Sequence, residues 1–369
     1  MWGRIRALAV KEFLALLKDK RSRALLIVPP ILQLLIFGYA ATYDLKQVPY
    51  ALYNEDPGAA ARDLVAMFRG SVHFREAANP TSNAEIAPLV DARKVLLVLH
   101  IGPRFSRDLL SGGQVSFQVI VDGRNSNTAL IASGYVRDVV SQFNRQWSEQ
   151  RGLPGPPAVI ETRAWFNPNL ESRWFFLPGI IGILTLLLTM LITALSVARE
   201  REQGTFDQLL VTPLRPVEIL IGKALPGFVI GFTEATVITL IAVLWFGIPM
   251  LGNLATLYAG LAVFLLSSVG VGLMISSLAV TQQQGMLGAF LFMVPAILLS
   301  GFATPIANMP RAIQLITLAD PVRYFLVILR KLFLEGAGIE SLANQFWPMA
   351  AIGVVCLSFA AWLFRHRMY

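Results

Sequence analysis

The chain has 369 residues, of which 55% are hydrophobic and only 15% are charged, and its net charge is +8. Soluble domains carry roughly 25% charged residues, so this balance excludes an ordinary soluble protein and indicates an integral membrane protein. The basic excess lies beside apolar runs, which argues against a nucleic-acid-binding protein. One cysteine excludes an intrachain disulfide, and the three histidines lack metal-ligand spacing, so we expect no metal site.

The N-terminal 23 residues contain seven Lys or Arg against two acids, and two arginines follow the last apolar run. Basic flanks stay in the cytoplasm, so both termini are expected there. The first run is long enough to span, so we do not expect a cleaved signal peptide. Six runs of about 20 apolar residues predict the spans Ala24–Thr42, Phe175–Val197, Leu225–Phe246, Leu254–Leu278, Met286–Ala303 and Phe346–Phe364.

These runs predict an α-helical integral membrane protein with six transmembrane helices and an inserted α/β extracytoplasmic domain. Residues 1–23 are expected to form a cytoplasmic amphipathic helix, and residues 24–43 the first transmembrane helix. Residues 44–173 form the predicted periplasmic domain, and residues 174–369 hold the other five spans. That last part includes a cytoplasmic segment, 198–224, and an outward-facing re-entrant or interfacial segment, 304–345.

The predicted periplasmic domain has 14 basic and 13 acidic residues, as a translocated domain exempt from the positive-inside rule can have. Short apolar strands such as VPYALYN alternate with helices such as AAARDLVAMFRG, and a last strand, AVIETRAWF, leads back to the membrane. The polar turns NEDPG and VDGRNSN fit a ligand site, although turns at strand ends are the commoner explanation. No catalytic motif is present, so we expect no catalytic residues and no enzyme activity.

The stretch AREREQGTFDQLLVTPLRPVEILIGKALPG, Ala198 to Gly227, is a polar hinge between two apolar runs. Thr205 and Gln208 fit a capping box, which predicts a short helix over Phe206–Val211. Four acids balance four bases in residues 198–224, so the positive-inside rule alone does not explain the composition. We interpret the hinge as a docking element for a soluble partner, with a solvated loop as the alternative.

This hinge resembles the E-x-G-T, L-x-x-[ST]-P and [ILV]-x-x-K-x-[LI]-P elements of the type-2 permeases of ATP-binding-cassette (ABC) exporters. The segment LADPVRYFLVILRKLFLEG is similar to that family's interfacial segment, with Asp320, Pro321 and Tyr324 at its motif positions. We expect this segment to be an amphipathic helix at the membrane interface, with its basic side chains reaching the headgroups. The N-terminal RIRALAVKEFLALLKDKRS resembles the connecting helix, with Phe13, Leu16 and Leu17 on its apolar face.

The resemblance implies a permease that pairs with a second copy or close relative and with two separate cytoplasmic ABC ATPase subunits, which bind ATP and magnesium. It also implies a bacterial inner-membrane location, and it raises the prospect of a periplasmic adaptor and an outer-membrane channel. This chain itself is expected to bind no cofactor. The ATPase-coupling residues carried over by the resemblance are Arg199, Glu202, Gly204, Thr205, Phe206, Gln208 and Leu209.

Glu234 is the one acid well inside an apolar run, and such a residue is a functional candidate because burying it unpaired is costly. Contact with a cationic or polar substrate and a bond to a neighbouring helix both stay open. The leading hypothesis is export of a hydrophobic or amphiphilic compound such as a drug or lipid. The alternatives are an ion-coupled secondary transporter, weakened by the single intramembrane acid and the lack of a repeat, and a membrane-anchored sensor with an extracytoplasmic ligand domain.

Overall fold

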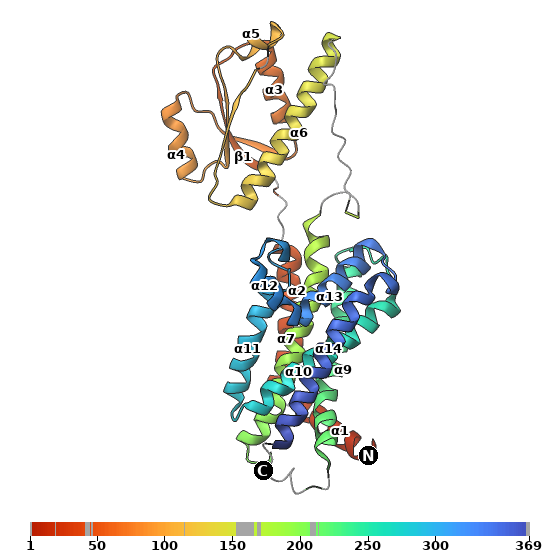
Figure 1. Cartoon of the computed structure of the whole chain (residues 1–369). Helices are drawn as coiled ribbons and strands as arrows, with labels where there is room; N and C mark the ends of the chain where they lie inside the picture. The colour runs from red at the N-terminus through yellow and green to blue at the C-terminus, as the bar shows by residue number, and fades with distance from the viewer. Residues whose placement is uncertain are drawn as a thin grey trace. The chain divides into compact units, whose positions relative to one another are not determined.

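The computed structural model describes residues 2–18, 20–40, 45, 47–113, 115–152, 166–167, 171–206, 212 and 214–366. The chain forms two compact units. One comprises Met1–Thr42 with Ala164–Tyr369 and is a helical bundle, and the other comprises Tyr43–Arg163 and contains a β-sheet. Figure 1 shows the helices and strands of each unit.

The bundle is built mainly from long apolar helices. In chain order its helices are α1 (Trp2–Lys18), α2 (Lys20–Ala40), α7 (Ser172–Glu202), α9 (Pro216–Leu244), α10 (Leu254–Leu278), α11 (Gln282–Leu299), α12 (Arg311–Ile316), α13 (Pro321–Arg330) and α14 (Ile339–His366). Helical turns of other types are η2 (Ile306–Asn308), η3 (Thr317–Ala319) and η4 (Lys331–Glu335).

Among the described residues, five helices are long and apolar enough to cross a membrane: α7, α9, α10, α11 and α14. The count rises to six if the pair Arg311–Ala319 and Pro321–Glu335, bent by 86°, is one broken span. The first predicted span, Ala24–Thr42, does not qualify by this criterion, because the apolar part of α2 is only Leu26–Tyr39. At 1.5 Å per residue, that part is shorter than a hydrocarbon core of about 30 Å.

Helix α7 lies at the centre of the bundle and packs against α2, α9, α10, α11 and α13. Its approach to α10 depends on small residues: a Cβ atom added at Gly272 would clash with the Thr193 side chain and lie 3.3 Å from the Met190 carbonyl oxygen. Ser276 adds a polar contact, since its hydroxyl accepts from the Val197 N–H at 2.9 Å. The sequence SSVGVGLMISS therefore serves close helix packing, as predicted for it.

The motif Asp320-Pro321 marks the break between η3 and α13. Asp320 Oδ1 accepts from the Val322 N–H at 2.9 Å and caps α13, whose first residue is Pro321. The Tyr324 hydroxyl donates back to the Leu318 carbonyl at 2.9 Å. We expected an amphipathic interfacial helix here; the structure adds that α13 is largely buried and packs against α7, α10 and α14, because most of its apolar side chains find partners there.

The second unit holds a four-stranded sheet in the order β2-β1-β3-β4, with β4 antiparallel to β3 and the other pairs parallel. The predicted strand AVIETRAWF lies outside the described residues except for Phe166. The elements are β1 (Val48–Asn54), α3 (Ala59–Gly70), β2 (Phe74–Ala78), η1 (Asn83–Glu85), α4 (Ile86–Asp91), β3 (Leu97–Ile101), α5 (Phe105–Leu110), β4 (Gln118–Val121) and α6 (Ser126–Arg151).

The two faces of this sheet are covered by different helices, because side chains alternate along each strand. Tyr50 of β1 and Leu97 of β3 share a cluster with apolar residues of α3 and α6. Ala51 and Val98, the next residues along, pack instead with Ile86 of α4. Figure 1 shows α3 and α6 on one side of the sheet and α4 on the other. The unit therefore has its own core on both faces.

Candidate functional site

The end of α7 is closed by the residues of the E-x-G-T element. Gly204 has a φ of +69°, the left-handed conformation that glycine adopts without strain. The Thr205 N–H donates to the Glu200 carbonyl at 3.0 Å, and the Gly204 N–H to the Arg201 carbonyl at 3.1 Å. This pair of bonds is a Schellman cap, which ends α7. The chain then enters the part of the hinge that joins α7 to α9, residues 203–215.

A buried ammonium lies next to this cap. The Lys223 side chain of α9 is 0% exposed, and its ammonium nitrogen lies close to three oxygen atoms. These are Glu200 Oε2 at 2.6 Å, Glu12 Oε1 at 3.2 Å and the Ser196 carbonyl at 3.3 Å. A lysine buried in this way is stable as a cation only with such partners, so the contacts fix α9 against α7 and α1.

Lys11 completes a neutral group of two bases and two acids. Its ammonium binds Glu200 Oε1 at 2.7 Å and lies 3.8 Å from Glu12 Oε1. Glu200 therefore uses one carboxylate oxygen for α1 and the other for α9. We call Lys11, Glu12, Glu200 and Lys223 the charge network; it joins α1 to α7 and α9, which lie far from α1 in the sequence.

An apolar cluster supports the same region. Phe206, the first residue after the cap, is 8% exposed and packs edge-on against Phe364 near the end of α14. Leu8 of α1 and Ile219 of α9 belong to the same cluster. The hinge therefore meets α1, α9 and the end of α14 at one end of the bundle, the α1 end (Figure 1).

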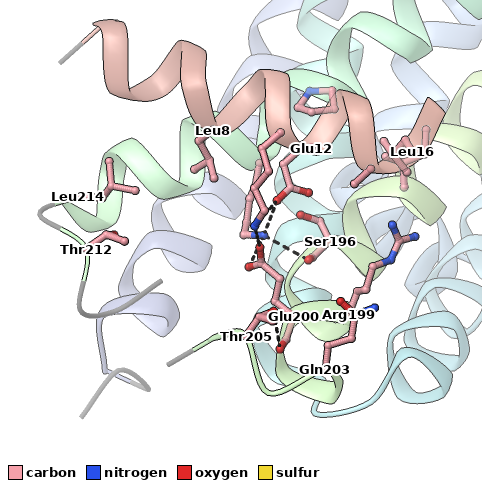
Figure 2. A pocket seen from close by; sticks show the side chains of 15 residues that line it. Leu8, Glu12, Leu16, Ser196, Arg199, Glu200, Gln203, Thr205, Thr212 and Leu214 are labelled. Atoms are coloured by element: carbon pink, nitrogen blue, oxygen red, sulfur yellow. Dashed lines mark hydrogen bonds and ion pairs between the residues drawn. The ribbon is translucent and has the colours of Figure 1, made fainter. Parts of the chain in front are cut away.

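A pocket of about 490 Å³ lies between α1, α7, α9 and the hinge. Figure 2 shows the Glu12 and Glu200 side chains pointing toward one another in it, with dashed lines marking the hydrogen bonds and ion pairs. Arg199, Thr205 and Leu16 are among the lining residues, together with Thr212 and Leu214 of the hinge. All four residues of the charge network line this pocket, and Lys11, which is 55% exposed, is the member most open to solvent.

Glu202 and Arg201 connect the end of α7 to the turn between α10 and α11. Glu202 Oε2 accepts from the Gln282 N–H at 2.8 Å. Arg201 donates to the carbonyls of Ser277 and Ala279 at 3.0 and 3.1 Å. A displacement of the hinge would therefore move α10 and α11 as well as α1 and α9.

The predicted site residues divide into separate places. Arg199 and Thr205 line the same pocket as Leu16 of α1. Glu202 binds the turn between α10 and α11, Gly204 forms the turn that ends α7, and Phe206 packs in the apolar cluster. Phe13 and Leu17 line a different pocket, which also contains Glu234. Gln208 and Leu209, with the rest of the helix predicted after Phe206, lie outside the described residues. Asp320, Pro321 and Tyr324 form the break before α13 and do not join the charge network.

Sequence reasoning missed the charge network itself. The sequence pattern gives no role to Lys223, which stands in the [ILV]-x-x-K-x-[LI]-P element, or to Lys11 and Glu12 of the N-terminal helix. A usable signal was present: Lys223 is a lone base in an apolar stretch, so it needs an acid from another helix. Its partners, Glu12 and Glu200, are 211 and 23 residues away, and the sequence alone does not pair them.

An apolar bundle of five or six candidate spans, closed at one end by a charged hinge, defines a multi-pass membrane protein. Residues 20–362 match the family described as "ABC-2 family transporter protein", so the chain belongs to that family. It is therefore an ABC-2 transporter permease, and permeases of this family work with ABC ATPase subunits.

Curated relatives cover nearly the whole chain. The chain is 39% identical to the "Probable multidrug ABC transporter permease YbhR" of Escherichia coli K12, with 100% of each chain covered. It is 34% identical to the "Probable multidrug ABC transporter permease YbhS" of the same strain, over 91% of this chain and 89% of the relative. It is 29% identical to the "Inner membrane transport permease YhhJ", over 97% and 96%.

Proposed function

We propose that this chain is the transmembrane subunit of an ATP-driven exporter that moves a hydrophobic or amphiphilic compound out of the cytoplasm or inner membrane. The charge network supports the proposal most directly, because it ties α1 and α9 to the last turns of α7 beside the hinge. A push on the hinge would then move several spans together rather than bend one loop. The names of the YbhR and YbhS relatives, probable multidrug permeases, agree with export.

In this proposal the ATP and magnesium are bound by two separate ATPase subunits, and this chain is not itself an enzyme. Closure of the ATPases on ATP would press on the segment from Glu202 to Val211, with Gly204 holding the turn. Thr205 belongs to this segment, and Arg199 lines the same pocket as Thr205. The α1 helix would move with α7 and α9 as the connecting helix, because Lys11 binds Glu200 of α7 and Glu12 binds Lys223 of α9.

The proposed topology has six spans, α2, α7, α9, α10, α11 and α14, with both termini in the cytoplasm. The basic flank before α2 supports this orientation. The α1 end of the bundle then faces the ATPases, and the α/β unit lies in the periplasm. The bent pair α12–α13 is the outward-facing re-entrant segment of this proposal. A second permease copy or relative, a periplasmic adaptor and an outer-membrane channel complete the proposed assembly in the inner membrane.

Co-purification with vanadate-sensitive ATPase activity tests this proposal. Tagged wild-type permease from native membranes is compared with Glu202→Ala, Gly204→Ala and the control Gly3→Ala. Gly204→Ala forces a left-handed conformation on alanine at about 1–2 kcal/mol, whereas Gly3 has ordinary φ and open space around it. We expect wild type and Gly3→Ala to bring down the activity, and the two hinge variants to lose or uncouple it. Absence of ATPase from the wild type, where a control exporter complex survives, would contradict the proposal.

A further inference from the structure

A second pocket, of about 460 Å³, lies between α1, α2, α7 and α9. Of its 14 described lining residues, only Arg23, Thr233 and Glu234 are polar. The remainder are aliphatic side chains, one proline and one phenylalanine, and they include Leu188 of α7 and Val237 of α9. The pocket therefore accepts a largely apolar body, and its chemistry is decided by those three polar residues.

Glu234 lies in this pocket with only 9% of its surface exposed. In the described part of the chain, neither carboxylate oxygen of Glu234 has a hydrogen-bond partner. The neighbouring Thr233 hydroxyl is already used, since it donates to the Val229 carbonyl at 2.8 Å. Arg23 lines the same pocket but does not hydrogen-bond to Glu234. The two structural partners that the pocket could offer are thus not engaged with this carboxyl group.

An unpartnered acid in an apolar setting is costly, and such residues in membrane proteins face a cavity or a ligand. We propose that this pocket binds an amphiphilic cation, with an ammonium or amidinium group against Glu234 and an apolar body along α2 and α9. Charge complementarity selects this ligand class over neutral or anionic amphiphiles. The inference deepens the proposed export function by naming a substrate class, and it rests on that function for the step from binding to transport.

The test is a binding measurement that requires no ATPase, so its failure is separate from a failure of the coupling proposal. The permease in lipid nanodiscs is titrated with dodecane diamine dansylated at one end, whose free amine is cationic at pH 7, and with the neutral derivative in which that amine is acetylated; binding to empty nanodiscs is subtracted. We expect the wild type to bind the cationic probe at least about tenfold more tightly than the neutral one.

Three variants test whether the probes bind in this pocket and against Glu234. Glu234→Gln, which keeps the shape of the side chain, is expected to bind both probes equally and weakly. Val237→Trp fills the pocket from a side chain that is 41% exposed, so it is expected to lose both probes. Glu340→Gln removes an exposed carboxylate on α14 and is expected to behave as the wild type.

Stability measurements separate a ligand site from a structural bond. Without ligand, Glu234→Gln is expected to melt at the same temperature as the wild type or higher, because it removes an unpartnered buried acid. A lower melting temperature would show that Glu234 bonds structurally and would overturn the proposal. The proposal would also be overturned if the wild type bound the two probes with equal affinity and Glu234→Gln bound them as tightly as the wild type. That result would indicate a pocket for lipid chains alone.

Discussion

Lys223 of α9 and Glu200 of α7 form an ion pair of 2.6 Å in which the lysine side chain is fully buried. The pair lies beside the cap that ends α7, and Lys11 and Glu12 of α1 complete its charge balance. Ion pairs thus connect α1, α7 and α9 beside the end of α7, where the hinge begins to leave the bundle. This relationship is a physical basis for transmitting a movement of the hinge to the spans.

The ion pair is expected to show strong coupling in stability. Lys223→Met leaves Glu200 without its buried partner and should destabilise the bundle by about 3–5 kcal/mol. Glu200→Gln combined with Lys223→Met should recover part of this loss, with a coupling energy of about 1–3 kcal/mol. Denaturant unfolding in mixed micelles, with all four members of the cycle, measures it. Additive effects of the two substitutions would show that the pair is not coupled.

Close packing of α7 on α10 is expected to make Gly272 intolerant of a side chain. Gly272→Ala should destabilise the bundle by about 1–3 kcal/mol, because its Cβ meets Thr193 and the Met190 carbonyl. Thr193→Ala should relieve part of this cost in the double variant. Gly134→Ala, in the interior of α6 with open space around it, is the control and should be neutral or stabilising. Unchanged unfolding of Gly272→Ala would contradict the packing.

The α/β unit is expected to lose stability in acid through Glu76. Hydrogen bonds from Arg69 at 2.7 and 3.0 Å lower the pKa of Glu76; burial acts in the opposite direction and is outweighed. Because the folded pKa is depressed, the stabilisation is present above the unfolded value of about 4.3 and is lost as pH falls through the folded value.

Glu76→Gln therefore should lower the stability of this unit by about 1 kcal/mol at pH 7, and the difference should shrink below pH 4. Hydrogen exchange of peptides from residues 48–121, in the full chain and corrected for intrinsic rates, follows the unit. Thr81→Val, which removes a hydroxyl bonded to the exposed Glu85, is the matched surface control. A pH-independent difference between Glu76→Gln and wild type would exclude the ion pair as its cause.

Local patterns predicted much of the fold. The short apolar run VPYALYN predicted the strand β1 over the same residues, and AAARDLVAMFRG predicted α3, because such local patterns are readable within a few residues. The first span was predicted to begin at Ala24, whereas α2 runs from Lys20 to Ala40 and its apolar part is Leu26–Tyr39, because the basic residues continue the same helix. The interior packing of α13 was not foreseen, because an amphipathic pattern does not say whether the apolar face meets lipid or protein.

The candidate site was predictable in part for a similar reason. Gly204 and Glu202 were found from a local motif, and Glu234 from being a single acid in an apolar run. The charge network was not found, because Lys11 and Glu200 are 189 residues apart and only the packing of α1 against α7 and α9 brings them together. Long-range pairing of charges is a property of the tertiary structure, and one sequence contains no record of it.

The central claim, that the charge network carries motion from the ATPases to the spans, is tested most directly with Lys11→Met. Lys11 is 55% exposed, so this variant should fold, and Lys18→Met, on the same helix and exposed, is its control. Hydrogen exchange in α7 and α9 is compared between the nucleotide-free complex and the complex trapped with ATP, magnesium and vanadate. We predict that trapping alters exchange in these helices for wild type and Lys18→Met, and that Lys11→Met keeps its ATPases but loses at least about half of this change. An unaltered response in Lys11→Met, with the complex intact, would contradict the account.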